Sequence, residues 1–244
     1  MLLKDVSFQT PQENILFDEV LLHLAEQGQQ GEVLRFWESP QYFVVLGRIG
    51  KERDDVKLDE IGKGGIPLLR RTSGGGTVLQ GKGCLNYSLI LSKELDPQIA
   101  DLHRSYQVIL NKVINALKRL GIESKFCPTS DIALTENSKK ISGNAQRRSK
   151  KFILHHGTIL YGFDLGMIEK YLTQPKEIPK YRQGRSHSEF VTNISAEPRD
   201  IKDAFKKTFK VDHEENGLNH KELACLRLFL ETKEISVDPF ASAA

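Results

Sequence analysis

The strongest pattern in the sequence is a repeat of apolar residues three and four positions apart after Pro97. Leu102 and Ile109 belong to this repeat, which continues to Leu120 before Gly121 interrupts it. The spacing predicts a long amphipathic α-helix that ends at the glycine. One face of such a helix has to be buried, so we expect a sheet to pack against it.

Short runs rich in β-branched and aromatic residues stand on both sides of this helix and predict strands. We expect the first three runs to share one sheet, the next two to form a hairpin around Gly81-Lys82-Gly83, and the last three to form an antiparallel meander. In that order the runs are Val33–Trp37, Tyr42–Ile49 and Ile66–Arg70; Thr77–Gln80 and Leu85–Leu91; Asp131–Thr135, Lys140–Gln146 and Phe152–Tyr161.

Four further segments have helical spacing, and one long segment has no periodicity. The predicted helices are Gln12–Gln27, Asp164–Leu172, Pro198–Phe209 and Lys221–Thr232, and the aperiodic segment, Thr173–Ser195, predicts a long surface loop. Together the patterns predict one α+β domain over residues 1–195, in which a mixed, mostly antiparallel sheet is flanked by helices. Residues 196–244 are expected to form a short helical C-terminal tail packed on that domain.

Composition excludes several classes of protein. With 39% hydrophobic and 27% charged residues, the 244-residue chain has the balance of a folded globular protein. A formal net charge of +3 disfavours a nucleic-acid partner. No apolar run approaches the length of about 18 residues that a membrane span requires. Three irregularly spaced cysteines form no disulfide framework, so we expect the cytoplasm.

The segment Arg70–Val78, RRTSGGGTV, carries the first candidate site. Consecutive glycines suit a backbone that turns sharply or lets another group approach closely, so bare amides there can line a ligand. Arginines immediately before the glycines can supply cations for a phosphate or carboxylate, and Ser73 adds a hydroxyl donor. A glycine-rich turn without a ligand would have the same sequence, so this segment alone does not decide between a ligand-binding loop and a simple turn.

Two later segments carry further candidates. If Lys140 begins a strand, it points to a cleft while Ile141 points to the core, and a lysine there can bind a carboxylate and a phosphate together. A solvated lysine pair is the alternative. In His155-His156 the neighbours point to opposite faces, so one histidine at most faces a given pocket. No metal site is predicted, because no carboxylate or cysteine stands at ligand spacing.

These segments, in this order, resemble the lipoate-protein ligases and the octanoyl- and lipoyl-transferases, a family akin to the catalytic domain of biotin-protein ligases. The resemblance spans about Asn14 to Asn193. Its marks are RRTSGGGTV from Arg70, LNYS from Leu85, KISGNAQ from Lys140, HHGT from His155 and, more weakly, VTN from Val191. It implies a biotin/lipoate-ligase-like catalytic domain, in agreement with the patterns above.

The resemblance also implies an activity and a site. The chain would activate lipoate or octanoate with ATP and Mg as an acyl-adenylate, and would transfer the acyl group to a lysine of a lipoyl domain. Lys140 would meet the acyl carbonyl and the adenylate phosphate, Arg71 and Gly76–Leu79 would contact ATP, and the glycines would border the acyl chain. The implied binding residues are Arg70, Arg71, Ser73, Gly74, Gly75, Gly76, Thr77, Val78, Leu79, Asn86, Ser142, Gly143, His156, Gly157 and Thr158. No permanently bound cofactor is implied.

Partners follow from the same resemblance. The acceptor would be a lipoyl domain of a 2-oxoacid dehydrogenase complex or the H protein of glycine cleavage. The cluster Arg147–Lys151 is a solvated hairpin tip or a basic surface for that acidic acceptor. Many ligases also carry a C-terminal domain for which too few residues remain here, which suggests a minimal substitute, an accessory subunit or a reaction without adenylate.

Two departures keep other functions open. Gln80-Gly81 stands where most of these ligases have His-Asp, so a non-catalytic acyl-binding or partner subunit is an alternative. Cys127 lies upstream of the lysine segment, where some transferases use a cysteine to take the acyl group from a carrier protein. A nearby lysine would favour its thiolate, although a buried core thiol is an equally good interpretation. Cys84 and Cys225 are expected in the core.

Overall fold

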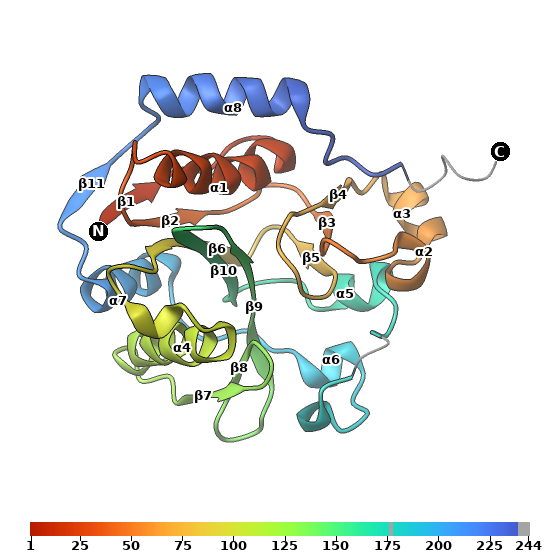
Figure 1. Ribbon diagram of the computed structural model, residues 1–244. Helices are drawn as coiled ribbons and strands as arrows, with labels where there is room; N and C mark the ends of the chain where they lie inside the picture. Colours follow the sequence, from red (N-terminus) through yellow and green to blue (C-terminus); the bar gives the residue numbers. More distant parts are fainter. Residues whose placement is uncertain (176–177, 239–244) are drawn as a thin grey trace.

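A large mixed sheet forms the centre of the molecule (Figure 1). The structure is a computed structural model that describes residues 1–175 and 178–238. The sheet has eight strands in the order β11-β1-β2-β6-β10-β9-β8-β7. Their bounds are β1 (Leu2–Asp5), β2 (Val33–Trp37), β6 (Cys84–Ser92), β7 (Ser124–Cys127), β8 (Asp131–Leu134), β9 (Lys140–Arg148), β10 (Phe152–Leu160) and β11 (His213–Glu215).

The three longest strands lie side by side in the middle. β6, β10 and β9 are antiparallel, and β8 and β7 continue the antiparallel order to one edge. This confirms the predicted meander and the mostly antiparallel α+β class. β1 is parallel to both β2 and β11, and no sequence pattern predicted β1, β7 or β11. These three strands are short, with three or four residues each, so they offer little alternation to recognise.

A second, three-stranded sheet lies beside the first and corrects two predictions. Its order is β4-β3-β5, with β3 (Phe43–Leu46), β4 (Leu68–Arg70) and β5 (Val78–Gln80). The prediction of one sheet for the first three runs is wrong, because β2 pairs with β6 whereas β3 pairs with β4 and β5. The predicted hairpin is also wrong. The Gly83 carbonyl accepts from Tyr161 and Gly162 beyond β10, which directs β6 into the large sheet and away from β5.

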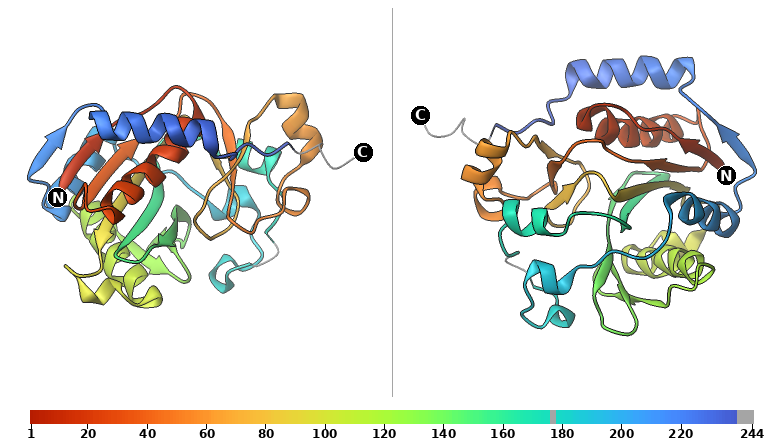
Figure 2. Two further views of the ribbon diagram at one scale, coloured as in Figure 1. Left: turned by 45° about the horizontal axis from the view of Figure 1, so that its top comes forward. Right: turned by 180° about the vertical axis from the view of Figure 1, so that it is seen from behind.

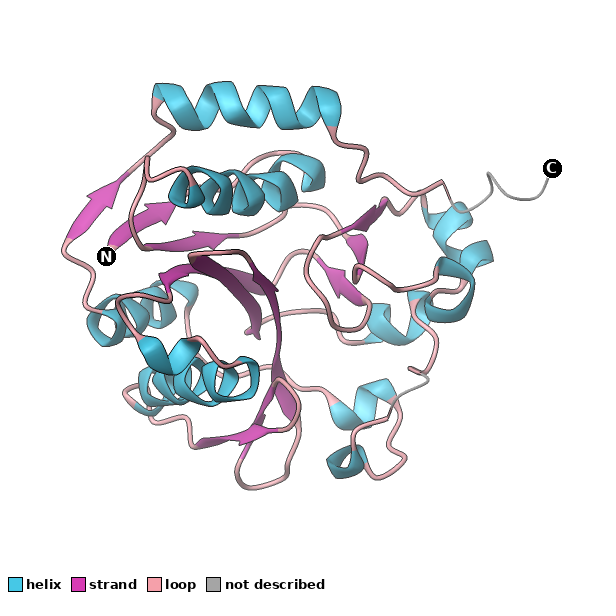
Figure 3. Ribbon diagram, viewed as in Figure 1, coloured by secondary structure: helices cyan, strands magenta, loops and turns pink. Residues whose placement is uncertain are grey.

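Helices cover both faces of the large sheet (Figures 2 and 3). α4 (Leu102–Lys118) and α7 (Pro198–Phe209) pack with one face of the sheet in one core cluster, and α1 (Pro11–Glu26) and α8 (His220–Thr232) belong to the cluster on the other face. The remaining helices are short: α2 (Glu52–Asp55), α3 (Leu58–Gly64), α5 (Gly166–Tyr171), α6 (His187–Phe190) and the 3₁₀ turns η1 (Pro97–Ile99) and η2 (Lys180–Arg182). The predicted helices are therefore confirmed, and the charged segment 51–63, for which no helix was predicted, contains α2 and most of α3.

The predicted surface loop Thr173–Ser195 is only partly a surface loop. It contains η2 and α6, and Arg182, Phe190 and Val191 in it are buried. A parallel bridge joins Val191 to Lys140, and the Thr192 amide donates to the Lys140 carbonyl at 2.9 Å. Residues 176 and 177 of this predicted loop lie outside the described residues. The segment thus packs against the start of β9.

Residues 196–238 contribute to the same layers, residues 239–244 of the predicted tail lie outside the described residues, and the boundary at residue 195 stays a prediction. β11 extends the large sheet, so the tail is not helical alone. Lys4 on β1 is fully buried and binds Glu222 on α8 at 2.9 Å, an ion pair that ties α8 to the sheet. None of the helices in the described residues is long and apolar enough to cross a membrane.

The pH dependence of stability is expected to follow His155 on β10. This side chain is fully buried between the rings of Tyr87 and Tyr106, and burial, helped by His156, lowers its pKa to about 3. An unfolded histidine binds a proton below about pH 6.5, whereas the folded one stays neutral until about pH 3. The free energy of unfolding should therefore fall as the pH drops through this window.

Replacing the imidazole tests this directly. We expect His155→Phe to lose less stability than the wild type between pH 7 and pH 5 in denaturant titrations, because the ring that the unfolded state protonates is gone. His220→Phe, on the exposed first turn of α8, is the control and should keep the wild-type dependence. An unchanged pH dependence in His155→Phe would contradict the assignment.

Candidate active site

Lys140 opens β9 and points away from the core. Its neighbour Ile141 is fully buried, as the predicted alternation requires. The Lys140 side chain is 27% exposed, and its ammonium lies 2.7 Å from a carboxylate oxygen of Asp131 on β8. A Cβ atom on Gly143 would lie 3.1 Å from the ammonium nitrogen. Gly143 thus leaves the space over which the lysine folds.

One face of the central strands gathers several candidate residues. In the register of β6, β10 and β9, Ser88 stands opposite His156, and His156 stands opposite Ala145. Two residues further on each of β6 and β10, Asn86 stands opposite Thr158. Because side chains directly opposite one another in an antiparallel pair share a face, these residues form one polar surface. Asn86, His156 and Thr158 are therefore brought together as the resemblance implies.

Ser142 and Gly157 lie on the other face of the sheet. The Ser142 hydroxyl accepts a hydrogen bond from Asn144 at 3.1 Å, and Asn144 in turn is bonded to Tyr87 within the core. A Cβ atom on Gly157 would overlap the Asn144 amide. The Ser142 side chain and a Cβ atom on Gly157 thus both point to the face opposite Lys140, which does not match the prediction that these residues border the ligand.

The glycine loop, residues 73–77, lies over the same face as Lys140. A Cβ atom on Gly75 would come within 3.6 Å of the Ala145 Cβ, and the Gly74 amide donates to the Gln146 carbonyl at 3.4 Å. Ala145 and Gly143 are two residues apart on β9, so their side-chain positions are roughly 7 Å apart on one face. The glycine loop and the Lys140 ammonium therefore converge on adjacent positions of one strand.

The three glycines of the loop are not equivalent. Gly75 has φ +83°, which only glycine adopts readily, and a Cβ atom there would contact the Arg71 guanidinium at 3.1 Å. A Cβ atom added to Gly74 or Gly76 would have nothing within 4 Å, so the space beside these two residues is open. Gly75 thus shapes the turn, whereas its two neighbours leave room for a ligand.

Arg71 holds the loop from within. Its guanidinium donates to the carbonyls of Gly74 and Gly76, both at 2.8 Å, and to the Ser73 hydroxyl at 2.9 Å. Burial lowers its pKa to about 10, which leaves it charged at neutral pH. Arg70 donates to the Gly47 and Gly50 carbonyls. Both arginines are thus held by the backbone, and the expectation that they supply cations for a phosphate or carboxylate stays a prediction.

The remaining predicted residues of this segment anchor it. The Thr77 hydroxyl donates to Asp55 at 2.7 Å. Val78 packs against the cluster beneath α1, and Leu79 is buried in the cluster around the small sheet. Their side chains therefore point into the protein.

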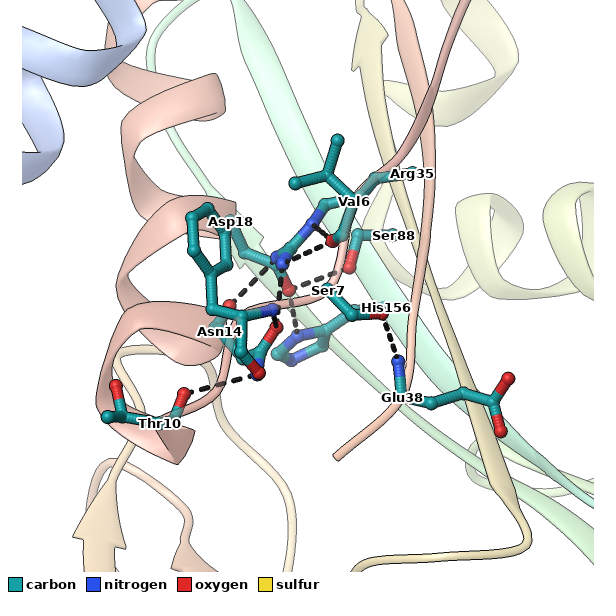
Figure 4. Close-up of polar contacts among 10 residues, drawn as sticks. Val6, Ser7, Thr10, Asn14, Asp18, Arg35, Glu38, Ser88 and His156 are labelled. Carbon is teal, nitrogen blue, oxygen red and sulfur yellow. Dashed lines mark hydrogen bonds and ion pairs between the residues drawn. The ribbon is translucent and has the colours of Figure 1, made fainter. Parts of the chain in front are cut away.

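A buried polar network connects this loop to α1, and Figure 4 shows the part of it around Asp18, Arg35 and His156. Arg35 on β2 is fully buried and binds Asp18 at 2.6 Å, and Asp18 also accepts from Ser88 at 2.6 Å. Burial alone would raise the pKa of Asp18, but Arg35 and His156 hold it below its ordinary value. His156 lies 3.5 Å from Asp18 through Nδ1 and 2.7 Å from the Ser73 hydroxyl through Nε2. His156 thus links the ion pair to the glycine loop.

Sequence reasoning missed four members of the site. Asp18 and Arg35 interrupt apolar runs, and a charge within a buried pattern is the signal that could have found them. Asp131 follows Cys127 closely, but nothing local ties it to Lys140. Tyr181, whose hydroxyl donates to Asp131 at 2.6 Å, comes from a segment without any periodicity. Only the folded chain reveals these last two.

The cysteines lie in apolar or covered positions. Cys127 is 5% exposed at the end of β7, and burial, together with Asp131, raises the pKa of its thiol. The expectation that the lysine would favour its thiolate is therefore wrong, because Lys140 is already paired with Asp131. Cys84 is buried, as predicted, and Cys225 on α8 is half-buried against the core.

The structure also shows the surroundings of Gln80 and of the basic cluster Arg147–Lys151. Gln80, in the place of the usual histidine, accepts a hydrogen bond from the Cys84 thiol at 3.2 Å. Arg148 of the basic cluster donates to the Ile99 and Ala100 carbonyls, so it is held rather than solvated, while Lys150 and Lys151 are exposed. Within the described residues, no cluster of three histidine, cysteine or acidic side chains is arranged to hold a metal ion.

The family model of the lipoyl protein ligase A/B catalytic domain matches residues 10–210. The chain belongs to this family. It is therefore an enzyme of protein acylation, either a lipoate-protein ligase or a related octanoyl- or lipoyl-transferase. The glycine loop, Lys140 and His156 all lie within the matched residues.

Relatives in this ligase and transferase family carry both activities in their names. The chain is 30% identical to octanoyltransferase LipM of Macrococcus caseolyticus, over 92% of this chain and 88% of that protein. It is 27% identical to lipoate-protein ligase A subunit 1 of Thermoplasma acidophilum, over 90% of this chain and 88% of that protein. The ligase from the bi-partite system of T. acidophilum superposes with a TM-score of 0.80 at 25% identity, covering 95% of this chain and 92% of that one. A lipoate-protein ligase A bound with ATP superposes with the same TM-score and identity, and the superposition covers 95% of this chain and 94% of that one.

Gly47 provides a test of the loop geometry. A Cβ atom there would overlap the Gly75 carbonyl oxygen, so Gly47→Ala must displace the Gly75 backbone away from Gly47 and disturb the glycine loop. We expect a loss of stability of about 1–3 kcal/mol and a larger loss of activity than of stability. Gly31→Ala is the matched control, since nothing lies within 4 Å of its added methyl group. Melting curves and acyl-transfer rates measure both; wild-type activity in Gly47→Ala would refute the close approach.

Proposed function

We propose that this protein is an ATP-dependent lipoate-protein ligase. It activates lipoate or octanoate as an acyl-adenylate and transfers the acyl group to a lysine of a lipoyl domain. The observation that carries this choice is the burial of Cys127, the cysteine closest in sequence to the lysine segment: its side chain is 5% exposed at the end of β7, and that burial raises the pKa of its thiol. A protonated, covered thiol is a poor nucleophile, which disfavours an acyl-thioester on this chain.

The proposed reaction has two steps. The acyl carboxylate attacks the α-phosphate of ATP and pyrophosphate leaves; the amine of the acceptor lysine then attacks the acyl carbonyl and AMP leaves. A lysine ammonium has three hydrogen-bond donors, and Asp131 takes one from Lys140. The others are available to the acyl carbonyl oxygen and the phosphate, whose negative charge they stabilise.

The glycine loop provides the second element of the site. With Arg71 holding the carbonyls of Gly74 and Gly76, the open space beside these glycines suits a ligand against the backbone. We assign the acyl chain and the ATP phosphates to this region between the loop and Lys140. Each buried methylene of the chain would add about 0.8 kcal/mol of binding free energy. ATP and Mg enter as substrates.

The proposed partners follow from the family. The acceptor is a lipoyl domain of a 2-oxoacid dehydrogenase complex or the glycine cleavage H protein. The bi-partite ligase of T. acidophilum supports an accessory subunit as a second partner. We place the reaction in the cytoplasm, because the cysteines are unpaired.

A second candidate is an ATP-independent octanoyltransferase. The similarity to octanoyltransferase LipM of M. caseolyticus favours it. In that case Cys127 would take the octanoyl group from an acyl carrier protein, and its thiol would have to become exposed first.

One incubation separates the two. Purified protein is mixed with lipoate or octanoate, ATP, Mg and an apo lipoyl domain, and the intact mass of the domain and the pyrophosphate released are measured. The ligase requires pyrophosphate release that depends on the acid, and unchanged rates in Cys127→Ser. Cys225→Ser, on the far helix α8, is the control for cysteine loss.

The opposite result identifies the transferase. Acylation from an octanoylated carrier protein without ATP, lost in Cys127→Ser but not in Cys225→Ser, would overturn the ligase proposal. Activity that appears only after an accessory protein is added would assign the chain as one subunit of a two-part ligase.

A further inference from the structure

Asp131 uses both oxygens of its carboxylate. One oxygen accepts from the Lys140 ammonium at 2.7 Å and the other accepts from the Tyr181 hydroxyl at 2.6 Å. Asp131 itself is buried, at the first position of β8. With a partner on each side, the plane of this carboxylate is fixed, and so is the direction in which it holds the lysine.

Tyr181 is itself held in place. Its ring packs on Phe190 with the centroids 5.1 Å apart, and its carbonyl accepts from Arg185 at 2.8 Å. Arg185 also reaches the Ser138 carbonyl in the turn before β9, at 3.2 Å. Burial raises the pKa of the Tyr181 hydroxyl, and the neighbouring Asp131 charge raises it further, so the hydroxyl remains a donor at neutral pH.

We propose that Tyr181 is a positioning residue for the acylation reaction: its hydroxyl holds the Asp131 carboxylate so that the Lys140 ammonium faces the acyl carboxylate. This inference rests on the proposed function only in giving Lys140 the acyl group as its partner. Tyr181 touches no substrate and acts through Asp131 and Lys140.

The physical reason is competition for the ammonium. A buried carboxylate oxygen needs a hydrogen-bond partner. Without the Tyr181 hydroxyl, the second oxygen of Asp131 has to turn to the same ammonium. Lys140 then gives a further donor to Asp131, and fewer donors remain for the acyl group.

Tyr181→Phe tests the proposal. It removes only the hydroxyl and keeps the ring on Phe190. A hydrogen bond to a charged group is worth roughly a 10- to 100-fold change in an equilibrium or a rate. We expect single-turnover formation of the acyl-adenylate to slow at least about 10-fold, octanoate binding to weaken, and the melting temperature to change little.

A double-mutant cycle distinguishes positioning from a general structural role. On a Lys140→Met background, adding Tyr181→Phe should cause no further loss, since the group through which it acts is absent. Tyr161→Phe is the matched control: its hydroxyl also donates to a carboxylate, Glu38, with no lysine in the pair. Wild-type rates and octanoate affinity in Tyr181→Phe, or equal losses with and without Lys140, would overturn the proposal.

The readouts also separate this inference from the ligase proposal. Calorimetric binding of octanoate needs no ATP. If the wild type binds octanoate but releases no pyrophosphate, the ligase proposal fails, and the effect of Tyr181→Phe on octanoate affinity still supports or overturns the role of Tyr181. Absence of binding of both octanoate and lipoate in the wild type overturns both.

Discussion

Replacing Lys140 by alanine should reduce the rate of acyl transfer by about 100- to 1,000-fold, a much larger effect than the loss of stability from leaving the Asp131 carboxylate with the Tyr181 hydroxyl as its partner. Removing one preorganised donor at a reacting carbonyl has a cost of this size. The side chain is part-exposed at the start of β9, so its removal opens no cavity in the core. Steady-state rates with an apo lipoyl domain and a melting curve measure the two effects.

Two variants make this expectation specific. Lys139→Ala removes a neighbouring lysine in the turn before β9 and should retain wild-type rates. Lys140→Arg keeps the charge but replaces a compact ammonium by a planar guanidinium, so it should restore little of the rate. Lys140→Ala with more than a tenth of the wild-type rate would remove this residue from the chemistry.

Replacing Arg35 by methionine should cost about 3–5 kcal/mol of folding free energy. The guanidinium is completely buried, binds Asp18 at 2.6 Å and donates to the Asn14 carbonyl at 2.8 Å. Methionine fills much of the volume but leaves the Asp18 carboxylate buried with only Ser88 and His156. For a chain of this length, the melting temperature should fall by roughly 6 to 20 °C.

The surface pair Lys202–Asp5 is the control for Arg35. Its atoms are 2.8 Å apart, but both side chains are partly in water, so Lys202→Ala should cost less than about 1 kcal/mol. Because Asp18 also holds His156 against the glycine loop, Arg35→Met should lower activity below the temperature at which it unfolds. Equal melting temperatures for the two variants would show that the buried pair carries no net stability.

The repeating patterns were sufficient to predict most helices and the central strands. The repeat from Leu102 to Leu117 became α4, and Pro198–Phe209 became α7 without a change at either end. The three runs after α4 became β8, β9 and β10 in the expected antiparallel order. The two helices and the nine-residue strands β9 and β10 are long and strongly periodic, so local sequence alone determines their type.

The pairing of strands could not be predicted in the same way. The runs that became β3, β4 and β5 were recognised by the same kind of pattern as those of the large sheet, yet they form a sheet of their own. The choice depends on contacts far apart in sequence, such as the Gly83 carbonyl with the Tyr161 amide. No local pattern records such contacts.

The sequence by itself determined the α+β class, the glycine loop and Lys140, because each is encoded in contiguous residues whose spacing or resemblance carries the information. Only the tertiary structure decided that Asp131 and Tyr181 meet at that lysine, that Arg71 supports the loop from within, and that Cys127 is covered. Burial and charge pairing arise from residues that the chain brings together from distant segments. Burial and charge pairing determine which groups are free to react. The direction of a side chain and the pKa of a thiol therefore follow from packing rather than from the order of residues.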